Sequence, residues 1–401
     1  MTDIPGQIGN SRPKPGRRTA IPLDLKSLRH DLHRHPELGF QEERTKAIVA
    51  SHLRDLGLEV EVGAGVVGVL RNGNANRAIG LRADMDALPI NETSKHDYIS
   101  QNPGVMHACG HDGHTAMLLG AAAQLAETRD FDGIVVFIFQ PNEEHGLGAL
   151  KMLDEGLLQR FEMDEVYAIH NLPGAPTGQV STRKGLICNS ESLFEITIKG
   201  QGGHASMPHV GVDAITIGAE VVTALQTIVS RKLPPGAGAV VSVTEFLTDG
   251  QRNVLPGWAC LKGDARAQKP EDRKLIAHLM EQITKGIGAA HGVEITLQFK
   301  TEFIETINAP APTDAVIQAA KSQGLEVNAD RDPMSFSEDF AHFAAAIPGC
   351  FLLLGNGTEG AHGRPLHASD YDFNDALLPI GTALWSQLVA ERLPLLKRKS
   401  R

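Results

Sequence analysis

The sequence predicts an α/β protein with a mostly parallel sheet, into which a second domain of ferredoxin-like topology is inserted. Three observations lead to this fold class. The length of 401 residues exceeds the size at which one hydrophobic core usually stops growing. Amphipathic helices alternate with short apolar strands over residues 25–185, which is typical of a parallel sheet covered by helices. Residues 187–305 break this alternation and follow an order of their own.

The elements of the first part of the chain follow from hydrophobic periodicity. Apolar residues at helical spacing predict helices over 25–35, 41–57, 113–128 and 147–159. Short apolar runs predict buried strands over 66–71, 78–83, 133–140 and 165–170. Polar side chains that can bind a metal follow the strand ends, and open α/β sheets bind ligands at the carboxyl ends of their strands.

The middle of the chain predicts a β-α-β-β-α-β unit, the split βαβ ferredoxin-like motif. Its elements are expected at 191–200, 211–230, 238–246, 260–267, 270–290 and 293–301. The segment 308–314 is interpreted as the return linker, and a final helix, strand and helix are expected at 314–324, 350–354 and 375–391. The predicted domains are therefore 25–186 with 306–401, and the inserted 187–305. Residues 1–24, with Pro, Gly and Arg, are predicted to be a mobile tail.

Charge and apolar run lengths exclude several classes of partner. A formal net charge of −10 argues against binding a polyanion such as nucleic acid. The longest apolar runs, 133–139 and 350–355, are far shorter than the roughly 20 residues of a membrane span. Four scattered cysteines and the lack of an apolar signal region favour reduced thiols and a cytoplasmic location.

The densest chemical signal is MHACGHDGH at 106–114, just before a predicted helix. Thiolate and imidazole donors together suit Zn²⁺ or a related divalent ion. Cys109 and His111 are two positions apart, so both side chains can face one way in an extended turn. His114, one helical turn further on, could support a ligand from behind. The alternative is a helix N-terminus with incidental histidines.

A second signal is the pair Glu143 and Glu144, where the strand at 133–140 runs into a turn. Adjacent side chains cannot point the same way, so one glutamate can bind a metal while the other acts as general base. The alternative is a solvated acidic turn.

Further polar residues extend this pattern. His170 ends a predicted strand, and His367 lies in the loop RPLHASDYDF, where His362 competes with it as a late ligand. An ordinary hydrogen-bonded histidine is the alternative for each. Asp84 and Asp86 face one side of an extended turn, where they can orient imidazoles or touch a metal. Their alternative is a turn capped by aspartates.

Taken in order, eight motifs resemble the M20 metallopeptidase superfamily, in particular its amidohydrolase branch with the hippurate hydrolase and indoleacetyl-amino-acid hydrolase proteins. The resemblance spans about residues 25 to 390. The motifs are LHRHPELGFQE (32–42), RADMDALP (82–89), MHACGHDGHT (106–115), QPNEEHGLGA (140–149), AIHNLP (168–173), GQGGHASMPHVGVDAI (200–215), RNVLPG (252–257) and LHASDYDF (366–373).

The resemblance implies a site for two divalent ions, Zn, Mn or Co, in the first domain. Its ligands would be Cys109, His111, Glu144, His170 and His367. It also implies that Glu143 is the general base and that Asp86 orients the site. The chain departs from the family pattern at two positions: Asp84 stands where other branches carry a histidine ligand, and His145 follows the paired glutamates instead of glycine.

By the same resemblance, the inserted domain is a lid and a dimerisation domain, and the protein is a homodimer. His204 would reach an active site, its own or the partner subunit's, and stabilise the oxyanion. Asn253 and Arg266 would bind the substrate carbonyl and carboxylate, for which the forked guanidinium is suited. A surface cation is the alternative for Arg266.

These residues predict a metal-dependent amidohydrolase that acts on carbon–nitrogen bonds other than peptide bonds. Its expected substrate is an N-acyl amino acid or a small peptide, cleaved to a carboxylic acid and an amino acid. The residues are also compatible with two other hypotheses. One is a metal-independent hydrolase with Cys109 as nucleophile. The other is a metal-binding or ligand-binding protein of the same fold without turnover.

Overall fold

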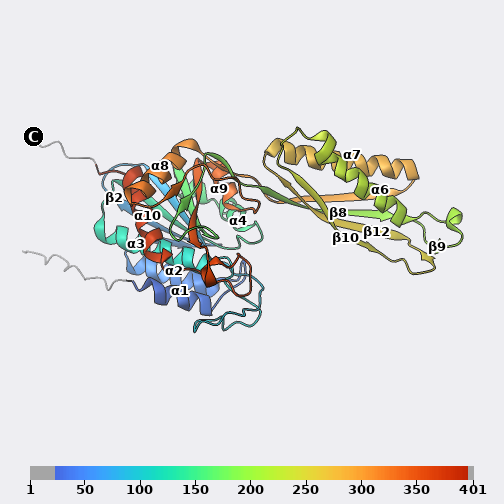
Figure 1. The fold of residues 1–401 in the computed structure, drawn as a ribbon. Helices are drawn as coiled ribbons and strands as arrows, with labels where there is room; N and C mark the ends of the chain where they lie inside the picture. The colour runs from blue at the N-terminus through green and yellow to red at the C-terminus, as the bar shows by residue number, and fades with distance from the viewer. Residues whose placement is uncertain (1–22, 396–401) are drawn as a thin grey trace, which may run out of the picture.

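The computed structural model describes residues 23–395, and Figure 1 shows two bodies joined by a narrow connection. The larger body contains both ends of the described chain, and the smaller one is formed by the middle of the chain. The predicted tail lies outside the described residues, except for its last two positions.

The larger body is built on a mixed, mostly parallel sheet of eight strands. The parallel pairs are β4 with β3, β3 with β5, β5 with β16, and β6 with β15, and the remaining neighbours are antiparallel. The predicted α/β class with a mostly parallel sheet is therefore confirmed. In sheet order the strands are β1 (Glu59–Val62), β2 (Val66–Asn72), β4 (Gly133–Gln140), β3 (Ala78–Asp84), β5 (Glu165–Pro173), β16 (Gly349–Gly357), β6 (Val180–Ser181) and β15 (Val327–Asn328).

Helices cover both faces of this sheet, so its central strands are buried on two sides and read as nearly continuous apolar runs. One face packs against α1 (Leu25–Arg34), α2 (Glu43–Asp55), α3 (His111–Thr128), α8 (Pro310–Ser322) and α10 (Leu377–Arg392). The other face packs against α4 (Gly148–Asp154), α5 (Leu157–Arg160) and α9 (Phe340–Ala346). Along β4, Val135 and Phe137 enter the first core, whereas Val136 and Ile138 enter the second. Within residues 23–395, no helix is both long and apolar enough to cross a membrane.

The smaller body has a four-stranded antiparallel sheet with two long helices. Its elements in chain order are β8 (Ser190–Lys199), α6 (Ala214–Thr227), a π-helical turn (Ile228–Lys232), β10 (Val240–Thr248), β12 (Trp258–Ala267), α7 (Pro270–His291) and β13 (Glu294–Phe303). The sheet order is β10, β12, β8, β13. Alternate residues of β8 are buried, because only one face of this sheet is covered by helices.

At the far end of the smaller body, two short strands, β9 (Gly203–His204) and β11 (Val254–Leu255), pair with each other. At the near end, β7 (Gly185–Cys188) and β14 (Thr306–Asn308) pair as antiparallel strands where the chain leaves and re-enters the larger body. The two crossings therefore run side by side.

Two predicted elements differ from the structure. The linker expected at 308–314 ends earlier than predicted, because α8 begins at Pro310. Proline is favourable in the first turn of a helix, where its missing N–H would have no partner within the helix. The helix expected at 147–159 is two short helices. Gly156 separates them with a positive φ of 83°, a backbone conformation that ends a helix and favours glycine.

Candidate metal centre and active site

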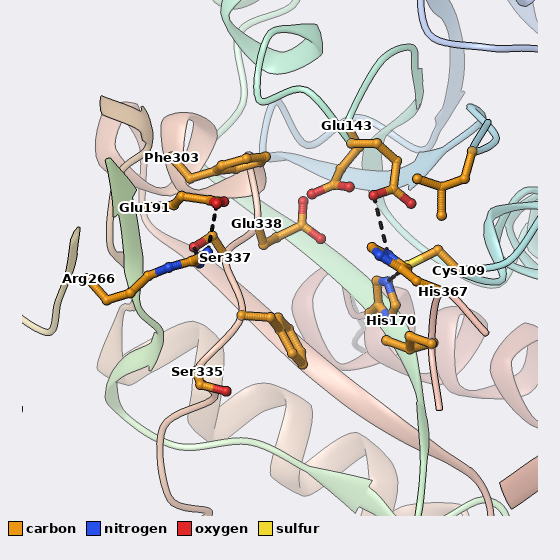
Figure 2. A pocket seen from close by; sticks show the side chains of 14 residues that line it. Cys109, Glu143, His170, Glu191, Arg266, Phe303, Ser335, Ser337, Glu338 and His367 are labelled. Atoms are coloured by element: carbon orange, nitrogen blue, oxygen red, sulfur yellow. Dashed lines mark hydrogen bonds and ion pairs between the residues drawn. The ribbon is translucent and has the colours of Figure 1, made fainter. Parts of the chain in front are cut away.

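Five potential metal donors gather at the carboxyl ends of the sheet strands. His170 lies on β5, Glu144 follows β4, and Cys109 and His111 stand at the start of α3. His367 comes from the loop after the 3₁₀ turn at Gly360–Gly363. Figure 2 shows Cys109, His170 and His367 together at one side of a pocket, facing Glu143.

The donor atoms are close enough to share cations. Cys109 Sγ lies 3.4 Å from His170 Nε2, and His367 Nε2 lies 3.4 Å from a Glu144 carboxylate oxygen. His111 Nε2 lies 4.0 Å from the other Glu144 oxygen. The donor atoms of Cys109, His111 and His170 lie within 4.8 Å of one another, as do those of Cys109, Glu144 and His367. Cys109 belongs to both groups, and Glu144 has one oxygen near His111 and the other near His367.

Two of the histidines have hydrogen bonds at Nδ1, as is usual for histidines that bind a metal through Nε2. His111 Nδ1 donates to the backbone oxygen of Asp86 at 2.9 Å, with an Asp86 carboxylate oxygen at 3.2 Å. His170 Nδ1 donates to the backbone oxygen of Asn171 at 2.7 Å. Each bond places a proton on Nδ1, so Nε2, which faces the other donors, would be the ligand atom for a bound ion. Asp86 also accepts from the backbone N–H of Glu144 at 3.0 Å, so one carboxylate orients two donor residues.

Two of the donor atoms are buried without any partner. His111 Nε2 and Glu144 Oε1 have no hydrogen-bond partner among the described residues. A buried polar atom left unpaired costs about 1–3 kcal/mol. Thiolate, imidazole and carboxylate donors around such atoms match the ligands of Zn²⁺ and related ions. The residues present therefore fit divalent metal.

The carboxylates of the pocket are crowded. Burial, together with Glu338 and Glu144, raises the pKa of Glu143 well above its usual range. Burial raises the pKa of Glu144 to about 8, although His111 acts in the opposite direction. Divalent cations would remove this mutual repulsion and restore the ionised forms.

Burial also raises the pKa of the Cys109 thiol well above its usual range, and the carboxylates of Glu144 and Glu143 raise it further. A catalytic cysteine needs an electropositive surrounding that favours the thiolate. Without a metal, Cys109 has the opposite surrounding. This observation counts against the hypothesis of a metal-independent thiol hydrolase.

The profile of the family described as peptidase family M20/M25/M40 matches residues 80–391. The chain belongs to this family. The hippurate hydrolase of Campylobacter jejuni is 38% identical over 375 residues, which cover 92% of this chain and 97% of that protein. The N-acetyldiaminopimelate deacetylase of Exiguobacterium sibiricum is 35% identical over 350 residues, with 86% and 94% covered.

Among solved structures, the YXEP protein of Bacillus subtilis, described as a dinuclear metal binding peptidase from the M20 family, matches with a TM-score of 0.79 at 30% identity. The match covers 93% of this chain and 98% of that chain. The resemblance predicted from the motifs is thus confirmed, and the chain is an M20 hydrolase of the amidohydrolase branch.

The turn that presents Cys109 and His111 in this M20 hydrolase requires a glycine. Gly110 has a φ of 99°, and a Cβ atom there would lie 2.2 Å from Asn171 Oδ1. His367 also has a positive φ, of 65°, and its N–H donates to the backbone oxygen of Ala108 at 2.8 Å. Strained backbone of this kind is often found at functional sites. The late loop is thereby bonded to the Cys109 turn.

Asp84 lies behind the donors in a buried ionic network. It accepts from Arg82 Nη1 at 2.7 Å and from His114 Nδ1 at 2.7 Å. His114 Nε2 in turn accepts from the backbone N–H of Asn171 at 3.0 Å. Both nitrogens of His114 are therefore occupied within the protein, which suits the supporting position expected for it.

Arg266 lines the pocket from β12 of the smaller body. Its guanidinium donates to Glu191 at 2.6 Å, Asp264 at 2.7 Å and Ser337 at 3.0 Å. The pocket has a volume of about 670 Å³. Its apolar lining consists of Leu88, Phe303, Phe336 and Leu366.

His204 and Asn253 lie elsewhere in this single chain. Both are exposed residues near β9 and β11, at the end of the smaller body remote from the larger one. The N–H of Ala205 donates to the backbone oxygen of Asn253 at 3.1 Å, so the two segments are joined to each other. Neither residue lines the pocket, and their predicted roles stay predictions.

The structure also shows the contacts of His362 and His145, whose roles the sequence did not decide. His362 lies in the 3₁₀ turn with its Nδ1 3.9 Å from an Asp372 carboxylate oxygen, so of the two competing late histidines the one at the donors is His367. His145 Nδ1 lies 2.8 Å from Asn142 Oδ1. Asn142 has a positive φ of 46°, and this contact stabilises the turn before Glu143.

The segment SFSEDF at 335–340 also contributes to the site, although its sequence did not predict this. Ser337 and Glu338 line the pocket, and Asp339 accepts from Arg82 at 3.0 Å. The only signal was an acidic pair before a short helix, which is common on protein surfaces. Its burial against Arg82 depends on tertiary packing.

Proposed function

We propose that this M20 hydrolase cleaves the amide bond of N-acyl amino acids or small peptides with the help of two divalent ions, Zn, Mn or Co. The observation that carries the proposal is the convergence of five donors, two of which have buried atoms without hydrogen-bond partners among the described residues, His111 Nε2 and Glu144 Oε1. The proposed ligands are Cys109, His111, Glu144, His170 and His367.

The proposed roles follow from the side chains that surround the pocket. Divalent ions held by these five residues would lower the pKa of water and polarise a carbonyl oxygen. Glu143, whose carboxyl group lies in the pocket beside the donors, takes a proton from the attacking water and passes it to the leaving amide nitrogen. Asp86 positions His111 and Glu144 through the three contacts described above.

The pocket lining supports an apolar acyl group. Leu88, Phe303, Phe336 and Leu366 offer the hydrophobic surface that such a group would bury. Arg266 is the proposed partner of the substrate carboxylate, which would compete with Glu191 and Asp264 for the guanidinium. The relatives named hippurate hydrolase and N-acetyldiaminopimelate deacetylase are consistent with this class of substrate.

Removal of metal tests the proposal against the thiol alternative. We expect dialysis against a chelator to abolish hydrolysis of N-acyl amino acids, and Zn²⁺, Mn²⁺ or Co²⁺ to restore it, measured as amine release. Activity that persists without metal but is lost on alkylation of Cys109 would favour the thiol mechanism instead. No hydrolysis by the metal-loaded protein across a panel of acyl groups would favour a binding protein without turnover.

We further propose that residues 187–305 form a ferredoxin-like lid and dimerisation domain, and that residues 25–186 with 306–401 form the catalytic domain. The apolar side chains of Val240, Phe246, Leu247 and Trp258 are exposed on β10 and β12, and β10 is an edge strand, which is a ready surface for a second subunit. In this proposal His204 and Asn253 act at the pocket of the partner subunit. The expected cytoplasmic location stays a prediction.

Mixed dimers test whether His204 acts across the interface. A dimer of one His204→Ala chain and one Glu143→Gln chain has one pocket with an intact Glu143 and the partner's intact His204. If His204 acts in trans, we expect each mixed dimer to recover about half of the wild-type turnover, because one of two equivalent sites is complete. If it acts within its own chain, the mixed dimer stays as inactive as either parent.

A further inference from the structure

A second group of potential ligands lies away from the pocket, where the connection between β3 and α3 meets α1. Residues 89–105 of this connection contain no helix or strand. Loops of this length without secondary structure are uncommon in compact domains and often have a function. This loop leads directly into the turn that carries Cys109 and His111.

Three donor atoms converge between this loop and α1. Glu92 Oε1 lies 3.2 Å from His33 Nε2 and 3.1 Å from His96 Nε2. All three donor atoms lie within 4.8 Å of one another. Ligands about 2.0–2.2 Å from a tetrahedral Zn²⁺ are separated by roughly 3.3–3.5 Å from each other. The two measured contacts are close to that separation.

Outer contacts hold His33 and Glu92 from behind. His33 Nδ1 lies 2.8 Å from an Asp112 carboxylate oxygen, and its Nε2 makes a hydrogen bond of 3.2 Å with Glu92 Oε1. With a cation bound between them, the His33 proton would stay on Nδ1 and Nε2 would be the ligand atom. The other oxygen of Glu92 accepts from the backbone N–H of Ser100 at 2.6 Å. A carboxylate, a histidine and a metal in this order are a common arrangement at zinc sites.

His96 has no hydrogen bond that would account for the burial of its ring nitrogens. Its two ring nitrogens are buried and have no hydrogen-bond partner in the described part of the chain, although Nε2 is 3.1 Å from Glu92 Oε1. The ring of Tyr98 stacks on that of His96, with centroids 3.8 Å apart and an interplanar angle of 11°. The imidazole is therefore held in place while its nitrogens lack partners.

We propose that His33, Glu92 and His96 bind a further divalent cation of the Zn²⁺ type, which fixes the 89–105 loop to α1. Three protein ligands would leave a fourth position for water. The His96 side chain is 15% exposed, which gives an ion a route from solvent. The cation would be structural, and the inference does not depend on the proposed hydrolytic function.

Zinc stoichiometry tests the site on the full-length protein. After loading with Zn²⁺ and removal of free ion, we expect elemental analysis to find one equivalent fewer in His96→Asn and in Glu92→Gln than in the wild type. The matched control is His291→Asn, which removes a histidine from an exposed His–Glu pair, 2.7 Å from Glu220, and should leave the zinc content unchanged. Equal zinc content in the wild type and both test variants would refute the site.

Two further measurements separate this site from the Cys109 cluster and cover a variant that does not fold. With Co²⁺, we expect the thiolate charge-transfer band of the Cys109 cluster to be the same in His96→Asn as in the wild type, because the new site has no sulfur ligand. A band lost in the variant would contradict an independent site. In wild-type crystals soaked in zinc, an anomalous scattering peak between His33 and His96 is expected, and its absence would overturn the proposal.

Discussion

Glu143→Gln should retain its metal and lose turnover by about 10²–10⁴-fold, the usual contribution of a general base. Gln is nearly isosteric with Glu but cannot accept a proton at neutral pH. Glu143 is the proposed base and not one of the five proposed ligands, although its carboxylate also lies within 4.8 Å of the donor atoms of His111 and Glu144. The measurement is kcat for amine release, together with metal content by elemental analysis.

The control for this variant is Glu155→Gln, which changes a glutamate at the end of α4 that accepts from the N–H of Ala64. It lies outside the pocket, so its kcat should stay within about twofold of wild type, as expected for a surface change. A near-normal rate in Glu143→Gln would remove Glu143 from the role of base. Loss of metal in that variant would instead make it a ligand.

Arg82→Met should destabilise the larger body by about 3–5 kcal/mol, because the cation of a buried ionic network is removed while its carboxylates remain. Arg82 is 1% exposed, and its guanidinium donates to Asp84, Glu338 and Asp339 at 2.7–3.0 Å. Met fills similar volume without charge. We therefore expect the urea concentration at the midpoint of unfolding to be much lower for metal-free Arg82→Met than for the metal-free wild type.

Trp385 is a suitable probe for this experiment, since it is buried in the core of the larger body. The matched control is Arg71→Met on β2, where the guanidinium is exposed and lies 3.7 Å from Glu59. Such surface pairs contribute about 0–1 kcal/mol. If Arg82→Met is no more destabilising than Arg71→Met, the carboxylates do not depend on Arg82.

Much of the fold could be predicted because the periodicity of the sequence reflects burial. The strand at 133–140 and the helix at 270–291 were predicted within one residue, since β4 is apolar on both faces and α7 has one apolar stripe. Weak elements were missed. β6 and β15 are two residues long, which is too short for a periodic pattern, and they are defined by their pairing with each other and with β16.

The candidate site shows the same division. The sequence identifies two pairs of site residues, because the members of each pair are close along the chain and belong to residue types typical of metal sites. These pairs are Cys109 with His111 and Glu143 with Glu144. The contributions of Glu338 and Asp339 could not be predicted, because an acidic pair before a helix is common and does not indicate a site. Glu338 contacts Arg82 although the two residues are 256 positions apart in the chain.

By itself, the sequence determined the α/β class, the order of the elements and the family, because these depend on residue types and spacings along the chain. Only the tertiary structure decided that His362 lies beside Asp372, that Asp86 contacts both His111 and Glu144, and that His204 lies far from the pocket of its own chain. These are relations between distant segments, which depend on how the sheets and loops pack and leave no trace in local periodicity.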